Sequence, residues 1–137
     1  MNGYLLDTNI LSELRRPRPV LSVLDWLKGA PSEVLFLRVL TVGELSRAAN
    51  LLRSRDQPAA AALDHWIGQL RLQFEHRILP VDLAVAEAWA LLCARQPLPA
   101  IDGLLAATAR AHGLTVVTRN TAGFERAEVP VFNPFLL

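Results

Sequence analysis

The 137-residue sequence predicts an α/β domain in which helices cover both faces of a central, mostly parallel sheet. Short apolar runs alternate along the chain with longer stretches whose apolar residues recur at helical spacing. Within the short runs, apolar and polar residues do not alternate, which is typical of parallel strands buried on both faces. Because no repeat, low-complexity stretch or linker interrupts this order, we expect a single domain over residues 1–137.

Five short apolar runs are predicted to be strands. Each is rich in aliphatic or β-branched residues and is bounded by polar or turn-forming residues. The predicted strands cover residues 3–6, 34–39, 77–81, 114–118 and 129–132. Helical segments separate most of them, and this arrangement favours parallel pairing.

Six segments have helical periodicity. They cover residues 9–15, 20–28, 41–52, 59–74, 83–95 and 101–112. Pro17 and Pro19 end the first segment, because proline cannot continue a helix. Asp82 is placed to cap the fifth, and Gly113 is a suitable terminator of the sixth.

Composition excludes several classes of protein. Hydrophobic residues make up 52% of the chain, yet no run approaches the roughly 18–20 apolar residues that a membrane span requires. The N-terminus lacks the pattern of a signal peptide, and Cys93 is the only cysteine, so no internal disulfide framework can form. We therefore expect a cytoplasmic protein that does not contact a membrane.

The basic residues are almost all arginine. The net charge is only +1, and Lys28 is the single lysine. The planar guanidinium suits phosphate and carboxylate groups, but codon bias in a GC-rich genome would produce the same composition. The high apolar fraction also raises the possibility that a partner chain covers part of the surface.

Acidic residues occur near the ends of several predicted elements. Asp7 directly follows the first strand, Glu44 is expected in the first turn of the helix after the second strand, and Asp102 begins the helix that leads into the fourth. Asn120 lies just beyond the fourth strand. Because ligands of open α/β sheets bind beyond the carboxyl ends of the strands, we expect these residues to meet at one edge.

Each acidic residue also has a purely structural interpretation. Asp7 could cap a helix or form a turn, and Thr41-Val42-Gly43-Glu44 fits a capping box. Asp102 would be favoured near a helix N-terminus by the helix dipole alone. Each signal is weak by itself, and the functional interpretation rests on their convergence.

Such convergence would require a compensating charge. Two carboxylates about 5 Å apart repel by roughly 3 kcal/mol at an effective dielectric constant near 20. Mg²⁺ and Mn²⁺ are hard cations that take oxygen ligands and could supply this charge. Zinc is disfavoured because Cys93 stands alone and the three histidines, His65, His76 and His112, are scattered.

Four segments together resemble one known family. The segments YLLDTNILSEL, TVGELSRA, PAIDGLLAATARAHGLTVVTRNTAGF and VPVFNPF are similar to PIN-domain proteins, in particular the VapC/FitB-like toxins of type II toxin–antitoxin systems. The resemblance runs from about residue 3 to 134. It implies a three-layer fold with a central, mostly parallel sheet of four to five strands.

The resemblance also implies a function and a site. It implies an endoribonuclease that depends on Mg²⁺ or Mn²⁺, with Asp7, Glu44 and Asp102 as catalytic residues and metal ligands. Thr8 matches a hydroxyl residue that supports the site. Asn120 stands where the family usually has a fourth acidic residue, so the number of metal ions stays open.

Partners follow from the same resemblance, which implies a homodimer and an antitoxin whose C-terminal segment lies in a groove beside the site. We expect the helices of residues 9–28 and 41–52 to form the groove walls, with some of the three tryptophans as interface anchors.

The arginines after the first helix are candidates for contacts with RNA phosphates, although a solvated helix end explains them equally well. These candidates are Arg15, Arg16 and Arg18.

Three other functions compete with this interpretation. A phosphorelay receiver would need an acidic pair around the end of the first strand, whereas Leu5 and Leu6 precede Asp7. An aspartyl-phosphate phosphatase would need a second aspartate two residues after the nucleophile, and position 9 is Asn9. The more serious alternative is a catalytically weak or inactive PIN-like module that only binds RNA or protein. The presence of Asp7, Glu44 and Asp102 argues against such loss of activity.

Overall fold

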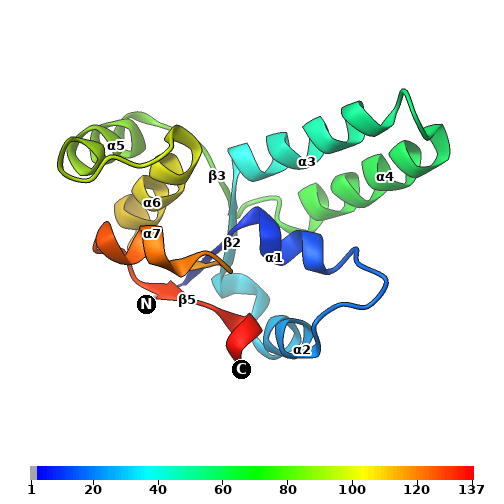
Figure 1. The fold of residues 1–137 in the computed structure, drawn as a ribbon, viewed down its shortest axis with the longest axis horizontal. Helices are drawn as coiled ribbons and strands as arrows, with labels where there is room; N and C mark the ends of the chain where they lie inside the picture. The colour runs from blue at the N-terminus through cyan, green and yellow to red at the C-terminus, as the bar shows by residue number, and fades with distance from the viewer. Residues whose placement is uncertain (1–2) are drawn as a thin grey trace.

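The computed structural model describes residues 3–137 and contains a five-stranded sheet at its centre (Figure 1). All neighbouring strands pair in parallel, in the order β3-β2-β1-β4-β5. The strands are β1 (Tyr4–Leu6), β2 (Leu35–Arg38), β3 (Ile78–Leu79), β4 (Thr115–Val117) and β5 (Val131–Phe132). The predicted fold class is therefore confirmed, with all five strands parallel and each shorter than expected.

Seven α-helices connect and cover these strands in the described part of the chain. They are α1 (Thr8–Glu13), α2 (Leu21–Gly29), α3 (Val39–Leu52), α4 (Gln57–Gln73), α5 (Leu83–Arg95), α6 (Ala100–His112) and α7 (Thr121–Arg126). Single 3₁₀ turns occur at Ser32–Val34 and Pro134–Leu136. No helix among residues 3–137 has both the length and the apolar character needed to cross a membrane.

The sheet separates two hydrophobic cores. Successive residues of a strand point to opposite faces, so Leu5 packs in one core and Leu6 in the other. Helices α5, α6 and α7 cover the face of Leu5, whereas α1 to α4 cover the face of Leu6 (Figure 1). Leu5 and Leu6 are both fully buried, so β1 lies at the middle of a three-layer molecule.

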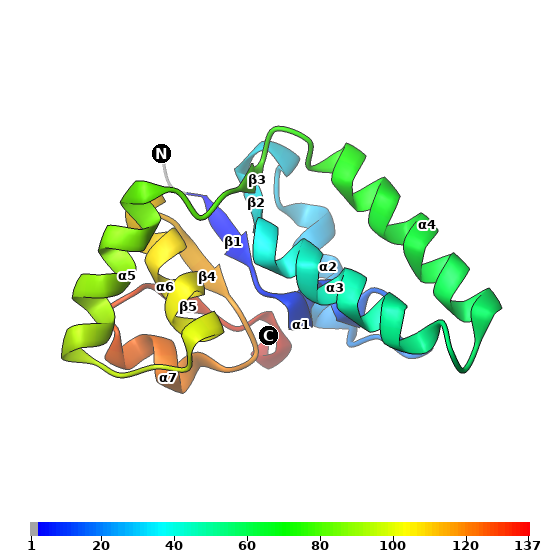
Figure 2. The ribbon, with the colours of Figure 1, turned by 90° about the horizontal axis from the view of Figure 1, so that it is seen from above.

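Helices α3 and α4 form an arm that extends away from the sheet (Figure 2). They run side by side and are joined by an exposed ion pair of 2.8 Å between Arg53 Nη1 and Asp64 Oδ2. Asp56 caps α4 by accepting a hydrogen bond from the Ala59 amide at 3.0 Å. The base of the arm is anchored by Leu45 and Ile67, which belong to the core that contains Leu6.

Several helices differ from the sequence prediction, and α4 begins at Gln57, two residues earlier than expected. Helix α3 begins at Val39, two residues earlier than expected, because the apolar run of β2 passes directly into it. Helix α7 was not predicted. It is only six residues long and buries Phe124 alone, so its sequence has no extended helical periodicity.

Candidate active site

The topology of the sheet creates one place where loops from different strands meet. Strand β1 has β2 on one side and β4 on the other. The connection that follows β1 leads to β2, whereas the later connection from β3 leads to β4 on the opposite side of β1. The carboxyl ends of β1 and β4 therefore form a switch point, where α/β sheets bind ligands. An open depression lies there, lined by Asp7, Thr8, Asn9, Ser12, Glu13, Arg16, Glu44, Asp102, Arg119 and Asn120. The five predicted catalytic residues are all among them.

Asp7 is held firmly at the end of β1. Its amide donates to the Val117 carbonyl at 2.9 Å, which ties it to β4. Its Oδ1 accepts from the Thr8 amide at 2.8 Å, so the predicted capping role is confirmed at the start of α1. Its Oδ2 accepts from the Thr118 hydroxyl at 2.9 Å and from Asn9 Nδ2 at 3.4 Å. The carboxylate thus performs a structural role and still faces the depression.

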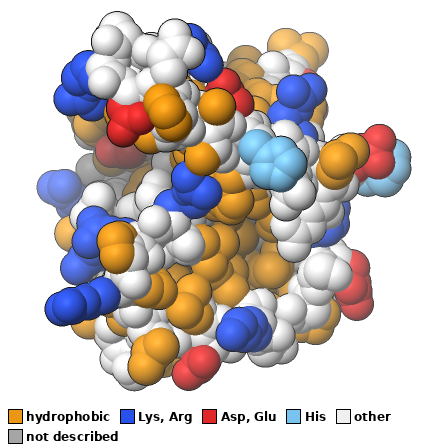
Figure 3. Space-filling view, turned by 90° about the vertical axis from the view of Figure 1, so that its right-hand side faces the viewer, with side chains coloured by type: hydrophobic (Ala, Val, Ile, Leu, Met, Phe, Trp, Pro, Cys, Tyr) orange, Lys and Arg blue, Asp and Glu red, His pale blue; other side chains and the backbone are white. Residues whose placement is uncertain are grey.

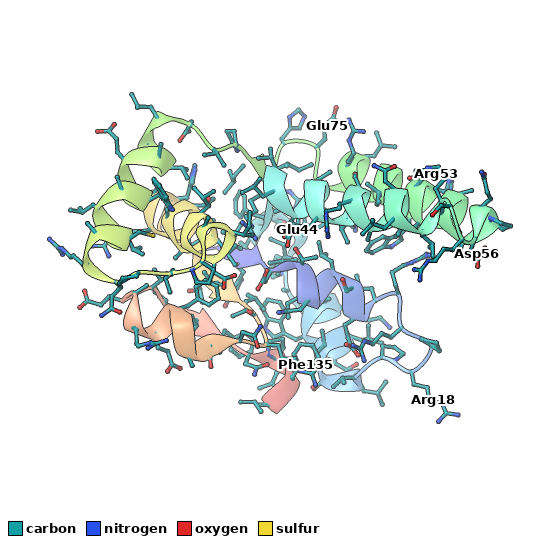
Figure 4. All side chains as sticks on the ribbon, turned by 45° about the horizontal axis from the view of Figure 1, so that its top comes forward. Arg18, Glu44, Arg53, Asp56, Glu75 and Phe135 are labelled. Carbon is teal, nitrogen blue, oxygen red and sulfur yellow. The ribbon has the colours of Figure 1, made fainter. Side chains whose placement is uncertain are left out.

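Glu44 is oriented by Thr8 of the first helix and by Arg38 at the N-cap of its own helix. Its Oε1 accepts from the Thr8 hydroxyl at 2.7 Å, and Figure 4 shows Glu44 between α3 and α1. The capping-box interpretation is wrong, because α3 already begins at Val39 and Arg38 is its N-cap. Thr41 is consequently buried inside the helix, and Glu44 lies beyond the first turn, contrary to expectation. Its side chain is free to enter the depression.

Asp102 lies in the first turn of α6, as predicted, with an exposed side chain. Among residues 3–137 no group makes a hydrogen bond or ion pair with its carboxylate. The small buried residues Gly103, Ala106 and Ala109 allow α6 to pack closely against its neighbours. Asp102 is therefore placed by a tightly packed helix while its oxygens stay available.

Asn120 also lines the depression, at the N-cap of α7. Its side chain makes no capping hydrogen bond. Its backbone amide donates to the Thr118 hydroxyl at 3.1 Å, the same hydroxyl that donates to Asp7. The neutral amide of Asn120 is thus near the carboxylates, where it can accept or donate a hydrogen bond without adding charge.

The three candidate RNA-binding arginines do not form one cluster. Arg16 lines the depression, and its Nε lies 3.4 Å from Glu13 Oε1. Arg15 lies over the ring of Trp66, 5.4 Å from the centroid, and lines a different groove. Arg18 lies on the loop after α1, and Figure 4 shows it far from Glu44. Arg119 is an additional arginine at the rim that sequence reasoning missed.

A buried arginine behind the depression was also missed. The side chain of Arg38 is only 1% exposed, at the end of β2. Its Nη2 donates to Glu44 Oε1 at 3.3 Å, and its Nη1 donates to the Ile101 carbonyl at 3.0 Å. Burial lowers the pKa of Arg38, while the carboxylates of Glu44, Asp7 and Asp102 act to raise it. The available signal was a basic residue inside the apolar run LFLRVL.

Thr118, Asn9 and Glu13 were missed as well, because their roles depend on contacts between distant segments. Thr118 is fully buried and connects β4 to Asp7, as described above. Asn9 Oδ1 accepts from the Arg119 amide at 3.3 Å. Glu13 is 3% exposed, and its Oε2 accepts from the Val20 amide at 2.8 Å, which holds the loop after α1.

The donor set of the depression fits a hard divalent cation. Several of the side chains that line it are carboxylates, and Mg²⁺ and Mn²⁺ prefer oxygen ligands of this type. In residues 3–137, however, no three acidic, histidine or cysteine side chains converge closely enough to form a ready-made cage. The site is thus an open set of oxygen ligands, and Mg²⁺ sites of that kind are commonly completed by water and substrate phosphate.

Comparison with protein families and curated proteins gives a consistent result. The family model described as "PIN domain" matches residues 4–130. Toxin FitB of Neisseria gonorrhoeae is 39% identical over 96% of this chain and 97% of its own length. The VapC ribonuclease Y4jK of Sinorhizobium fredii is 34% identical over 96% of both chains.

Solved structures agree with the sequence matches. The crystal structure of FitAcB from Neisseria gonorrhoeae superposes with a TM-score of 0.92 at 38% identity, covering 98% of this chain and 99% of that one. A toxin–antitoxin complex from Klebsiella pneumoniae superposes with a TM-score of 0.68 at 28% identity, covering 96% and 98%. The likeness therefore covers nearly the whole chain and includes the segments that carry Asp7, Glu44, Asp102 and Asn120.

Proposed function

The chain belongs to the PIN-domain family, and on that premise we propose that it is a Mg²⁺- or Mn²⁺-dependent endoribonuclease and the toxin of a type II toxin–antitoxin pair. The observation that carries the proposal is the position of Asp7, Glu44 and Asp102 around one depression at the switch point of the sheet. The names of the relatives, a toxin and a ribonuclease, support the same activity.

The three carboxylates differ in how firmly they are held, and this suggests a division of roles. Asp7 and Glu44 are each fixed by a threonine hydroxyl, so they would hold an ion with little loss of side-chain freedom. Asp102 has an uncommitted carboxylate that can turn toward an ion, a water molecule or substrate. A bound divalent ion would lower the pKa of a water molecule and neutralise charge that develops on the phosphate.

RNA would reach this depression along its rim. Arg16 and Arg119 lie there, and guanidinium groups suit phosphate oxygens. Arg119 is held by its ring contact, with Cζ 4.5 Å from the centroid of Phe135. We therefore assign phosphate contacts to Arg16 and Arg119, whereas Arg15 faces the neighbouring groove and Arg18 the loop after α1.

An apolar groove beside the site is proposed to hold the antitoxin. It is lined by Ser12, Arg15, Leu45, Ala48, Leu52, Ala59, Ala62, Leu63 and Trp66. The walls of the groove are thus α1, α3 and α4. The helix of residues 20–28, which was also expected to form a wall, is α2, and α4 takes its place. Figure 3 shows apolar side chains gathered in the hollow on this side of the molecule. The toxin–antitoxin complex that superposes on this chain supports a protein partner.

The catalytic proposal is tested by replacing Asp7. We expect Asp7→Asn to keep the fold, because the amide oxygen still accepts at the helix cap, and to abolish RNA cleavage in Mg²⁺ or Mn²⁺ buffer. The matched control is Asp64→Asn, an exposed acid on α4 paired with Arg53, which should cleave at the rate of the unchanged protein. Cleavage by Asp7→Asn at the original rate, or undiminished cleavage in excess chelator, would contradict the proposal.

A binding module without catalytic activity is the second candidate. The observations that favour it are the neutral Asn120 and the cationic Arg38, both of which reduce the negative charge around the site. It predicts RNA binding that Asp7→Asn leaves unchanged and no metal-dependent cleavage by the unchanged protein. The same cleavage assay therefore separates the two candidates.

A further inference from the structure

Arg38 is the least exposed charged side chain among the residues described here, and it lies behind the acidic depression. An arginine stays protonated at neutral pH even when buried, because its guanidinium is a very strong base. Removing such a charge from water is costly unless opposite charges compensate it. Glu44 bonds it directly, and the carboxylates of Asp7 and Asp102 also act on it.

The hydrogen bonding of Arg38 is incomplete. Nη1 donates to Ile101, directly before Asp102, and Nη2 donates to Glu44, but Nε is buried and has no partner. An unsatisfied buried donor destabilises the folded state, and the surrounding negative charges offset this cost. A guanidinium placed only to bridge backbone segments would use its donors more fully. This position therefore indicates a group retained for its charge.

Arg38 also shares a potential metal ligand. Glu44 Oε1 accepts from both Arg38 Nη2 and the Thr8 hydroxyl, so that oxygen is already engaged. A cation bound by Glu44 would lie close to a second positive charge. The other arginines of the depression, Arg16 and Arg119, are exposed, so water screens their charges far more than it screens that of Arg38.

We propose that Arg38 is a resident counter-cation of the acidic site, which offsets part of the negative charge of Asp7, Glu44 and Asp102 in the metal-free protein and thereby weakens divalent-metal binding. This inference rests on the proposed function, because it concerns the same metal site. The repulsion among the carboxylates is thereby reduced without an ion, and an ion bound by Glu44 must displace or share the contact with Arg38. Activity then depends on the concentration of free divalent metal.

The test compares two substitutions of Arg38 by calorimetric titration with Mn²⁺. Arg38→Met removes the positive charge and leaves a flexible, uncharged side chain. Arg38→Lys keeps the positive charge but lacks the planar guanidinium group. We expect Arg38→Met to bind Mn²⁺ on the order of tenfold more tightly and Arg38→Lys to bind like the unchanged protein. Arg53→Met is the control, since Arg53 lies on the distant arm, and its affinity should not change.

Failure of this inference differs from failure of the metal site itself. If the unchanged protein binds Mn²⁺ and Arg38→Met binds equally or more weakly, the counter-cation role is wrong and the metal-dependent nuclease stands. Equal tightening in Arg38→Met and Arg38→Lys would also overturn the role, because charge would then not be the cause. Absence of Mn²⁺ binding in both the unchanged protein and Arg38→Met would overturn the metal site and this inference together.

A second measurement needs no substitution and covers the case in which Arg38→Met does not fold. Titration of the unchanged protein with Mg²⁺ should shift the Nε–H resonance of Arg38, because the contact with Glu44 is displaced or shared. The corresponding resonance of Arg53 should not move. Shifts of the Asp7 and Thr8 amides without a shift at Arg38 would overturn the inference, and no shift anywhere would overturn the metal site.

Discussion

At the scale of single residues, two threonine hydroxyls fix two of the three acidic side chains. Thr8 bonds Glu44 across 36 residues of sequence, and Thr118 bonds Asp7 across 111 residues. Both are donors to a carboxylate, a class of hydrogen bond that is stronger than one between neutral groups. The two acids are therefore oriented before any ligand arrives.

We expect Thr8→Val to impair the site without unfolding the protein. Valine keeps the branched shape of threonine but cannot donate to Glu44, so this carboxylate would lose its orientation. Loss of a group that orients a metal ligand typically costs about 10–100-fold in metal affinity or activity. The measurements are the Mn²⁺ dissociation constant and the RNA cleavage rate, and Thr8→Ser should restore both. Unchanged values in Thr8→Val would show that the hydroxyl is dispensable.

The positions of the acids were predictable, but their contacts were not. Asp7 could be placed because it directly follows a buried strand, and strand ends share an edge. The direction of the Glu44 side chain could not, because it depends on Thr8 of another helix. Arg38 was missed for the same reason: a basic residue at the end of an apolar run gives no indication of which acids it faces.

At the scale of elements, the position of Asp102 depends on the close approach of α5 and α6. Gly103 is buried where the two helices meet. A methyl group at this position would lie 2.8 Å from Cys93 Sγ and 3.2 Å from Trp89 Nε1, closer than normal contacts allow. The glycine thus permits a tight helix pair immediately beside Asp102, a proposed catalytic residue.

Two glycine substitutions should have opposite effects on stability. Gly103→Ala would overpack the contact between α5 and α6, and we expect it to lower the free energy of unfolding by about 1–3 kcal/mol. Gly43→Ala adds a methyl group that meets nothing within 4 Å, in the interior of α3. It should raise the same quantity by roughly 0.5–1 kcal/mol, because alanine favours helix. Urea denaturation measures both, and similar changes in the two variants would contradict the packing argument.

Helices could be predicted from the sequence wherever apolar residues recurred at helical spacing over several turns. The helices of residues 59–74 and 83–95 were expected within about two residues of α4 and α5. Short elements could not be predicted in this way, because α7 and the 3₁₀ turns are too short for a helical period of apolar residues to appear. The start of α3 was predicted too late, because Thr41 is a residue type that often caps helices. In the structure the backbone passes from β2 directly into α3, and Thr41 lies inside the helix.

At the scale of the whole molecule, large apolar side chains remain exposed on α5. Leu83 is 75% exposed and Leu91 is 55% exposed, on a helix that packs against α6 and buries Val85 and Leu92. Their exposure is consistent with the homodimer implied by the family resemblance, in which a second copy would cover this surface.

Light scattering on the purified chain should therefore give about twice the monomer mass of 15.1 kDa. Replacing Leu83 and Leu91 together by Asp should shift the mass toward the monomer, since charge would face charge across the interface. Leu72→Asp is the control, because Leu72 on α4 is equally exposed at 74%. A monomer at micromolar concentration would refute the dimer, and a dimer unaffected by the paired change would refute this interface.

Strand β1 belongs to both cores, and this has a consequence for how the protein opens. Leu5 and Leu6 are anchored on opposite faces of the sheet, so we expect amide protons in β1 to exchange with solvent only when its pairing with β2 and β4 opens and this packing is lost. The amide of Asp7, which donates to the Val117 carbonyl, should be among these protected groups. We expect the arm of α3 and α4 to fray first at its tip, away from Leu45 and Ile67, which anchor its base in the core of Leu6. Asp7 would thus stay in place while the partner groove loosens, which allows the proposed partner to leave without global unfolding.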